Sequence, residues 1–232
     1  MKVIIAGGGT GGHLFPGLAI AEEFKRRDEN NEVVFVGTEH GIEARIIPRE
    51  GYPIRFLRSD GIVGKSPITR IKAMAKLVLS ALDAHRILKL LTPDIVIGVG
   101  GYSSGAIVMI AGLKSIPTMI HEQNSVPGLT NRILGRMVQR VCVTYHESAS
   151  SFPMGKTFLT GNPIRGKILR GDREAAYRLF SLSEDMFTVH SATNFSSTLF
   201  GVGPRRQRCC VRIDHGQRLL GVLARQRLLS CL

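Results

Sequence analysis

Residues 2–17 read KVIIAGGGTGGHLFPG and carry three structural signals in succession. The β-branched, apolar run Lys2–Ala6 predicts a buried strand, and the glycines that follow it predict a tight loop. Residues 16–27 then place apolar side chains at helical spacing, which predicts an amphipathic helix. A strand, a glycine loop and a helix in this order form the first part of a βαβ unit, from which parallel sheets are built.

The same alternation continues to about residue 165. Short apolar runs that predict strands lie at residues 32–36, 53–57, 94–98, 117–121 and 141–144. Helical patterns lie between them, at residues 68–91, 105–114 and 129–138. We therefore predict an α/β fold with a doubly wound, Rossmann-like parallel sheet. Ligands of such sheets bind at the carboxyl ends of the strands, which is where the glycine-rich segments of this sequence fall.

The composition is that of a globular protein. The chain has 232 residues, of which 44% are hydrophobic and 21% charged, and this excludes a mainly disordered chain. No apolar run reaches the length of about 18 residues that a membrane-spanning helix needs. The apolar run near the N-terminus is also shorter than that of a signal peptide, so we expect a cytoplasmic protein.

The charge is unevenly distributed. A net charge of +13 favours an anionic partner, such as nucleic acid, a phosphorylated ligand or an acidic membrane. Residues 190–232 contribute seven arginines against one aspartate and hold three of the four cysteines. No cysteine has the spacing of a zinc site or of a disulfide framework, so we predict no metal.

The glycine loop itself points to a ligand. Five of the six residues from Gly7 to Gly12 are glycine, which is more than a turn requires. Their N–H groups can approach a phosphate or sugar, and the following helix N-terminus favours negative charge. The loop also fits a dinucleotide-binding fingerprint. However, His13 and Pro16 then occupy the helix start, and Glu32, the candidate ribose-binding acid, begins the second strand instead of ending it.

His13 directly follows this loop. A histidine side chain titrates near neutral pH and can accept a proton as a general base. At the start of a helix it can equally be a cap or a packing residue.

Three further segments combine glycines or polar groups after a strand or turn. They are GVGGYSSG at residues 98–105, HEQNSVPGLTNR at 121–132 and TGNPIR at 160–165. Ser103 or Ser104 could cap the next helix, and the loop at residues 98–105 could also hold a second anionic group, since capping alone would not need its four glycines. The polar residues 122–124 suit the recognition of sugar hydroxyls, although they could also satisfy their own backbone. Arg165 could form a bidentate pair with a phosphate.

The helix predicted at residues 68–91 is both basic and apolar. Arg70, Lys72, Lys76 and Leu79 belong to it, together with further basic residues. Such a helix can lie on an anionic membrane. An ordinary crossover helix with a solvated, charged face has the same pattern.

In order and spacing, GGGTGGHLFPG, GVGGYSSG, HEQNSVPGLTNR and GNPIR resemble the MurG family, the N-acetylglucosaminyltransferases of bacterial peptidoglycan synthesis. The resemblance implies the N-terminal domain of a two-domain GT-B glycosyltransferase. It implies transfer of GlcNAc from UDP-GlcNAc to the C4 hydroxyl of undecaprenyl-pyrophosphoryl-MurNAc-pentapeptide, with inversion and without a cofactor. The implied partners are UDP-GlcNAc, this lipid-linked acceptor and the anionic cytoplasmic face of the inner membrane, to which the protein would bind peripherally.

The resemblance also assigns roles to single residues. His13 matches the general base on the acceptor hydroxyl. The donor site would include Thr10, Gly11, Gly12, Asn124 and Arg165. The acceptor site would include Gly100, Gly101, Tyr102 and Glu122. The membrane contact would fall on Arg70, Lys72, Lys76 and Leu79, and no metal is implied.

The resemblance ends before the chain does. Members of the family are longer, and after SLSEDMFTV they continue into a glycine-rich loop that is missing here. We therefore expect an acceptor-binding, membrane-associated domain at residues 1–165, and a linker with the start of the donor domain at 166–189. For the basic tail at 190–232 we expect an unrelated or disordered segment, which an interruption of the reading frame or gene would produce.

Three other functions compete with an active transferase. The first is an inactive fragment that binds the acceptor or the membrane but lacks the donor domain. The second is a nicotinamide-dependent oxidoreductase, which rests on the glycine fingerprint alone. The third is a nucleic-acid binder, which the charge suggests. We expect no nucleic-acid partner, because much of the charge lies in the tail and tryptophan is absent.

Overall fold

The computed structural model describes residues 1–58, 67–166, 173–179, 187–192, 196–202, 208–214 and 222–224, with only the backbone given for 67–77, for 173, 176 and 179, and after residue 186. The chain divides into two compact units, residues 1–169 and residues 170–232. Each unit is described by itself.

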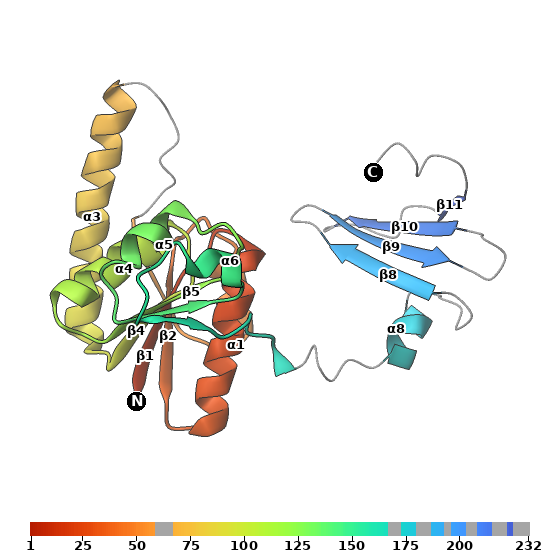
Figure 1. Cartoon of the computed structure of the whole chain (residues 1–232), viewed down its shortest axis with the longest axis horizontal. Helices are drawn as coiled ribbons and strands as arrows, with labels where there is room; N and C mark the ends of the chain where they lie inside the picture. The colour runs from red at the N-terminus through yellow and green to blue at the C-terminus, as the bar shows by residue number, and fades with distance from the viewer. Residues whose placement is uncertain are drawn as a thin grey trace. The chain divides into compact units, whose positions relative to one another are not determined.

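The first unit is built on a parallel sheet of seven strands in the order β3-β2-β1-β4-β5-β6-β7 (Figure 1). The strands are β1 (Lys2–Ala6), β2 (Glu32–Gly37), β3 (Ile54–Phe56), β4 (Ile95–Gly98), β5 (Thr118–Glu122), β6 (Arg140–Val143) and β7 (Thr157–Leu159). The chain builds outward from β1 to β3, then returns to β4 and builds in the other direction. The strand order therefore reverses between β1 and β4, and this is the position where sheets of this kind bind ligands.

Helices cover both faces of this sheet. They are α1 (Gly11–Arg27), α2 (Glu43–Arg49), α3 (Pro67–Leu91), α4 (Tyr102–Leu113), α5 (Leu129–Leu134) and α6 (His146–Ala149). Figure 1 shows α1 on one side of the sheet, with α3 and α4 on the other.

The alternation of side chains along β1 explains the two layers. Val3 and Ile5 belong to the core beneath α1 and α2, while Ile4 and Ala6 belong to the core beneath α3, α4 and α5. All four side chains are fully buried. A strand that is apolar on both faces is typical of a parallel sheet between two helical layers, so the prediction from residues 2–6 is confirmed.

Most of the predicted elements of this unit are present, with three differences. Helix α1 begins at Gly11 and not at Pro16, because the side-chain-free glycines and His13 supply its first turn and Pro16 is accommodated inside it. Helix α2 lies at residues 43–49, where the pattern predicted neither a helix nor a strand, and α6 and β7 are too short to give a periodic signal. Helix α4 begins at Tyr102 with Gly101 at its N-cap. The predicted cap by Ser103 or Ser104 is therefore wrong, since both serines lie inside the first turn.

The second unit contains helix α8 (Arg173–Leu179) and four antiparallel strands in the order β11-β10-β9-β8. The strands are β8 (Phe187–Ala192), β9 (Ser196–Val202), β10 (Arg208–Asp214) and β11 (Val222–Ala224). The described parts of the basic tail are thus strands paired in a meander. The proposed relation of residues 190–232 to an interrupted gene stays a prediction.

In the part of the chain that the structure describes, no helix combines the length and apolar character needed to cross a bilayer.

Candidate active site

Two glycine loops meet where the strand order reverses. The first follows β1 and the second follows β4, and the two strands are neighbours in the sheet. A β-carbon on Gly101 would lie 2.7 Å from the carbonyl oxygen of Gly8, and one on Gly7 would lie 2.7 Å from the carbonyl oxygen of Gly100. Glycine is required at these positions because the two backbones are in direct contact. The predicted donor and acceptor loops are therefore brought together.

His13 lies in the first turn of α1, against the second loop. A β-carbon on Gly100 would stand 2.6 Å from His13 Nδ1, and Gly100 has φ +100°, a conformation that side chains disfavour. The same nitrogen, His13 Nδ1, is hydrogen-bonded to Gln123 Oε1 at 3.1 Å. The imidazole is half-buried, and loops from three strands hold it in place.

Gln123 connects His13 to a second, buried histidine. Its Nε2 donates to the carbonyl oxygen of Val99 at 3.0 Å and lies 3.1 Å from His121 Nδ1. His121 Nε2 in turn lies 3.0 Å from the carbonyl oxygen of Gly161. Burial lowers the pKa of His121, although the Gly161 carbonyl and nearby Glu122 act in the opposite direction. Four segments distant in sequence are therefore joined by one chain of hydrogen bonds.

Glu122 was expected to contact the acceptor, but its carboxylate is committed to its own loop. The side chain is 1% exposed. It accepts hydrogen bonds from the backbone N–H of Asn124 and Gly128 and from the side-chain amides of Asn124 and Asn131, at 2.9–3.1 Å. Glu122 thus shapes the loop that carries Asn124, which remains exposed at the loop surface, and an acceptor contact of Glu122 stays a prediction.

Arg165 was expected at the donor phosphates, and the structure shows a different use of its guanidinium. The side chain is 5% exposed and forms a bidentate pair with Glu50 and a further bond, Nε to Oε1 at 2.6 Å, with Glu22. These carboxylates raise the pKa of Arg165 above its already high value. Glu22 lies nine residues beyond His13 on α1, about 14 Å along the helix. Arg165 thus anchors the segment after β7 to α1 and to the end of α2, and a donor contact stays a prediction.

Glu43 is a member of the site that sequence reasoning missed. It begins α2, is 1% exposed and accepts hydrogen bonds from the N–H of Gly9 at 2.8 Å and from the N–H and hydroxyl of Thr38 at 2.9 Å. β-carbons on Gly8, Gly37 or Gly41 would collide with its carboxylate. The two glycines that precede Glu43 in GTEHGIE, Gly37 and Gly41, were the available signal, because a buried carboxylate needs close backbone donors.

The remaining predicted residues fall in two places. Thr10, Gly11 and Gly12 form the N-terminus of α1, and Gly101 and Tyr102 form that of α4; neither helix has a side-chain cap. The side chains of Arg70, Lys72 and Lys76 lie outside the described residues, although the backbone of α3 there is helical. Leu79 is 37% exposed on α3, next to exposed Val78. Among the described residues, no group of three or more His, Cys, Asp or Glu is placed to hold a metal ion.

The fold and site define a Rossmann-like domain. At the edge of the sheet where such domains bind ligands, it has two helix N-termini without side-chain caps, a histidine and a polar loop. The model of the glycosyltransferase family 28 N-terminal domain matches residues 3–143. The chain therefore belongs to glycosyltransferase family 28 and contains its N-terminal domain.

Curated relatives carry one shared name, UDP-N-acetylglucosamine--N-acetylmuramyl-(pentapeptide) pyrophosphoryl-undecaprenol N-acetylglucosamine transferase. That of Myxococcus xanthus is 53% identical over 169 residues, which is 73% of this chain and 44% of the relative. That of Thermodesulfovibrio yellowstonii is 48% identical over 189 residues, 82% of this chain and 52% of the relative. The chain thus spans about half the length of the curated relatives it matches.

A solved structure agrees with these relatives. The crystal structure of MurG from Acinetobacter baumannii matches with a TM-score of 0.60 and 32% identity, over 72% of this chain and 46% of that chain. The resemblance to the MurG family and the predicted Rossmann-like domain of a GT-B glycosyltransferase are confirmed.

Proposed function

We propose that the chain supplies the N-terminal half of a transferase that moves GlcNAc from UDP-GlcNAc to the C4 hydroxyl of undecaprenyl-pyrophosphoryl-MurNAc-pentapeptide. The observation that carries this proposal is the position of His13. Its ring lies between the two glycine loops at the reversal of strand order, backed by Gly100 and hydrogen-bonded to Gln123. The shared name of relatives that are 48–53% identical supports the choice of substrates.

In this mechanism His13 acts as the general base. The C4 hydroxyl oxygen of the acceptor attacks the anomeric carbon of GlcNAc from the face opposite the UDP group, and its proton passes to the imidazole. The bond between the anomeric carbon and the UDP oxygen breaks, and UDP leaves with the electron pair. Attack from the opposite face inverts the anomeric centre. A positioned base of this kind contributes roughly 10²–10⁴-fold to the rate.

The two helix N-termini would bind the diphosphates. Thr10 is the N-cap residue of α1 and Gly101 that of α4, and neither makes a side-chain cap. No N-cap side chain therefore competes with a phosphate for the N–H groups of the first turn. A helix N-terminus stabilises negative charge. We assign Thr10, Gly11 and Gly12 to the donor side, and Gly100, Gly101 and Tyr102 to the acceptor diphosphate. Charge that develops on the leaving UDP makes these contacts strongest in the transition state.

Asn124 would contact the donor sugar. Its backbone N–H and its side-chain amide both donate to Glu122, which fixes the direction of the side chain. The amide oxygen is then the group that can accept from a sugar hydroxyl. Glu122 contributes by holding this loop.

The test uses the 232-residue chain and a hybrid in which residues 1–165 replace the matching part of the Myxococcus xanthus relative. UDP release is measured with UDP-GlcNAc and a short-chain analogue of the lipid-linked acceptor. We expect release from the hybrid to require both substrates, and His13→Ala to lower kcat by at least about 100-fold with little change in the KM for UDP-GlcNAc. A hybrid whose turnover is unchanged by His13→Ala would overturn the proposed base.

The same assays on the 232-residue chain alone distinguish an active transferase from the second candidate function, an inactive fragment that binds acceptor or membrane. Binding of the acceptor analogue without UDP release would support the fragment. UDP release by the chain alone would show that residues after 165 complete the donor site.

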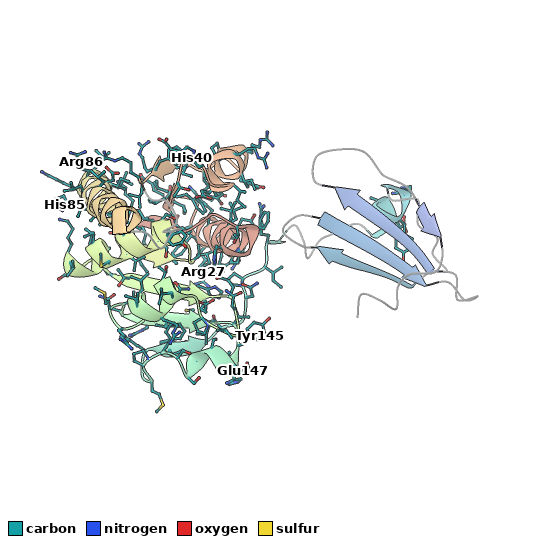
Figure 2. All side chains as sticks on the ribbon, turned by 90° about the horizontal axis from the view of Figure 1, so that it is seen from above. Arg27, His40, His85, Arg86, Tyr145 and Glu147 are labelled. Atoms are coloured by element: carbon teal, nitrogen blue, oxygen red, sulfur yellow. The ribbon has the colours of Figure 1, made fainter. Side chains whose placement is uncertain are left out.

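We further propose a peripheral position on the anionic inner face of the membrane, through α3. Val78, Leu79 and Leu82 are exposed on the described part of this helix, and Arg86 is exposed beside His85 on the outside of the unit (Figure 2). Exposed apolar groups next to basic ones suit an anionic interface.

Charge reversal tests the membrane contact. Lys72→Glu with Lys76→Glu should weaken sedimentation with vesicles that contain anionic lipid. The matched control reverses Arg45 and Arg49, which lie on exposed positions of α2 over the other face of the sheet, and should bind as the unchanged chain does. Equal loss in both variants would mean that net charge, and not α3, directs binding.

A further inference from the structure

The amide of Gln123 lies between two histidines, and its orientation determines which nitrogen of each ring carries hydrogen. Gln123 Nε2 faces the carbonyl oxygen of Val99 at 3.0 Å, while Gln123 Oε1 faces His13 Nδ1 at 3.1 Å. A backbone carbonyl can only accept a hydrogen bond. The amide nitrogen must therefore be the group that points at Val99, because the reverse orientation would oppose two oxygens.

The same reasoning extends to His13. With the amide oriented in this way, its oxygen faces His13 Nδ1, and an amide oxygen can only accept. Nδ1 must then carry the hydrogen that is donated to Gln123. In a neutral imidazole the other nitrogen, Nε2, is left with a free lone pair.

The contacts of the buried residue His121 give the same orientation of the Gln123 amide independently. The carbonyl oxygen of Gly161 accepts from His121 Nε2 at 3.0 Å, so the hydrogen of His121 lies on Nε2 and its Nδ1 is an acceptor. The second N–H of Gln123 lies between two acceptors of His121, its Nδ1 at 3.1 Å and its carbonyl oxygen at 3.3 Å, so either contact keeps the amide nitrogen on this side. Burial lowers the pKa of His121 and so favours the neutral ring that an acceptor at Nδ1 needs. Two backbone carbonyls, Val99 and Gly161, thus fix every hydrogen in the chain.

We propose that Gln123 is a positioning residue that holds His13 in the tautomer with hydrogen on Nδ1, so that Nε2 is the proton acceptor. The catalytic role of Gln123 rests on the proposed role of His13 as the base. His121 acts indirectly, since it orients the Gln123 amide and does not touch the His13 ring.

The tautomer can be read directly from the whole 232-residue chain. Labelling the histidine rings with ¹⁵N and recording long-range ¹H–¹⁵N spectra at pH 8 distinguishes a protonated from an unprotonated ring nitrogen. His13→Gln identifies the His13 signals by their loss. We expect His13 with hydrogen on Nδ1 and His121 with hydrogen on Nε2. A His13 ring with hydrogen mainly on Nε2 would overturn the proposal.

Substitution of Gln123 tests whether this residue determines the tautomer of His13. Gln123→Leu removes the acceptor at similar size, and the His13 ring should then populate both tautomers. Gln123→Met likewise removes the acceptor, with a flexible side chain of similar length, and should also populate both tautomers. His40 and His85, exposed on the outside of the unit, are internal controls whose ring signals should not change (Figure 2). Retention of the Nδ1–H tautomer in Gln123→Leu would overturn the role of Gln123. If that variant fails to fold, the unchanged chain and Gln123→Met still decide the question.

Turnover separates this inference from the proposed function. In the hybrid enzyme, Gln123→Leu should lower kcat about tenfold, less than the loss of His13 itself, with the KM for UDP-GlcNAc unchanged. Loss of activity in His13→Ala but not in Gln123→Leu would overturn the positioning role and leave His13 as base. Unchanged activity in both, with the Nδ1–H tautomer observed, would overturn the proposed base and leave the tautomer assignment standing.

Discussion

Gly100 lies so close to His13 that a β-carbon at position 100 would stand 2.6 Å from the imidazole Nδ1. The second glycine loop is therefore a wall of the histidine site as well as a neighbour of the first loop. The sequence pattern allowed an anionic group at residues 98–105, and the structure adds this steric role.

Gly100→Ala tests the contact. The new methyl group would displace the His13 ring from Gln123, and the φ of +100° would add strain of roughly 1–3 kcal/mol. We expect lower turnover in the hybrid and loss of the single His13 tautomer in the chain. Gly112→Ala, near the end of α4, is the control, since nothing lies within 4 Å of its added carbon. That variant should be neutral or more stable by up to about 1 kcal/mol. Equal behaviour of the two variants would argue against a specific contact at Gly100.

Glu43→Gln tests the support of the first glycine loop. The substitution removes the charge that accepts from Gly9 and Thr38, while the volume stays similar. Hydrogen bonds to a charged group contribute about 1.5–3 kcal/mol each, so the free energy of unfolding in urea should fall by at least about 1.5 kcal/mol. Exposed Glu39→Gln in the same segment should change it by less than about 0.5 kcal/mol. A neutral Glu43→Gln would mean that the loop does not depend on this carboxylate.

Arg165→Leu tests the anchor of the segment after β7. It leaves Glu22 and Glu50 without their shared cation, and loss of one partner of a buried pair costs about 3–5 kcal/mol. The two glutamates keep 31% and 26% of their side-chain exposure, so we expect a loss near the lower end of that range, about 3 kcal/mol. Urea unfolding measures it.

The control for Arg165 is Arg58→Leu. Arg58 also forms a bidentate pair, with Asp83, but is 56% exposed, so its removal should cost much less than that of Arg165. Similar losses at positions 165 and 58 would contradict an anchoring role that depends on burial.

The stability of the protein should depend on pH through His121. Its pKa in the folded state is lowered from the usual 6.5 by burial, so the unfolded chain binds a proton more readily. The stabilising contribution is complete above pH 6.5 and is lost as the pH falls through the folded-state pKa. Between pH 7.5 and 5.5 the free energy of unfolding should therefore fall more in the unchanged chain than in His121→Gln. His146→Gln, at an exposed position, should behave as the unchanged chain does. The same pH dependence in all three proteins would exclude His121 as its source.

The local sequence was sufficient to predict the parallel sheet and the edge of the sheet where a ligand would bind. Apolar runs such as Lys2–Ala6 carry their periodicity within a few residues, and each glycine loop adjoins the strand that presents it. The fold class, the family and the glycine-rich and polar segments that follow the strands could be predicted for this reason. Helix α2 was not predicted, because its seven residues are too few for a helical period and include Pro48.

The use of each polar side chain depended on partners that are distant in sequence. Glu43 reaches Gly9 across 34 positions, Gln123 reaches His13 across 110, and Arg165 reaches Glu22 across 143. A charged or amide group can bind a ligand or satisfy another part of the protein, and the residue type is the same in both cases. The sequence thus determined which groups gather at the strand ends. Only the tertiary structure decided that Glu122 and Arg165 are held by protein partners, while one ring nitrogen of His13 has no hydrogen-bond partner among the described residues. The reason is that burial requires each polar group to find its partner in three dimensions.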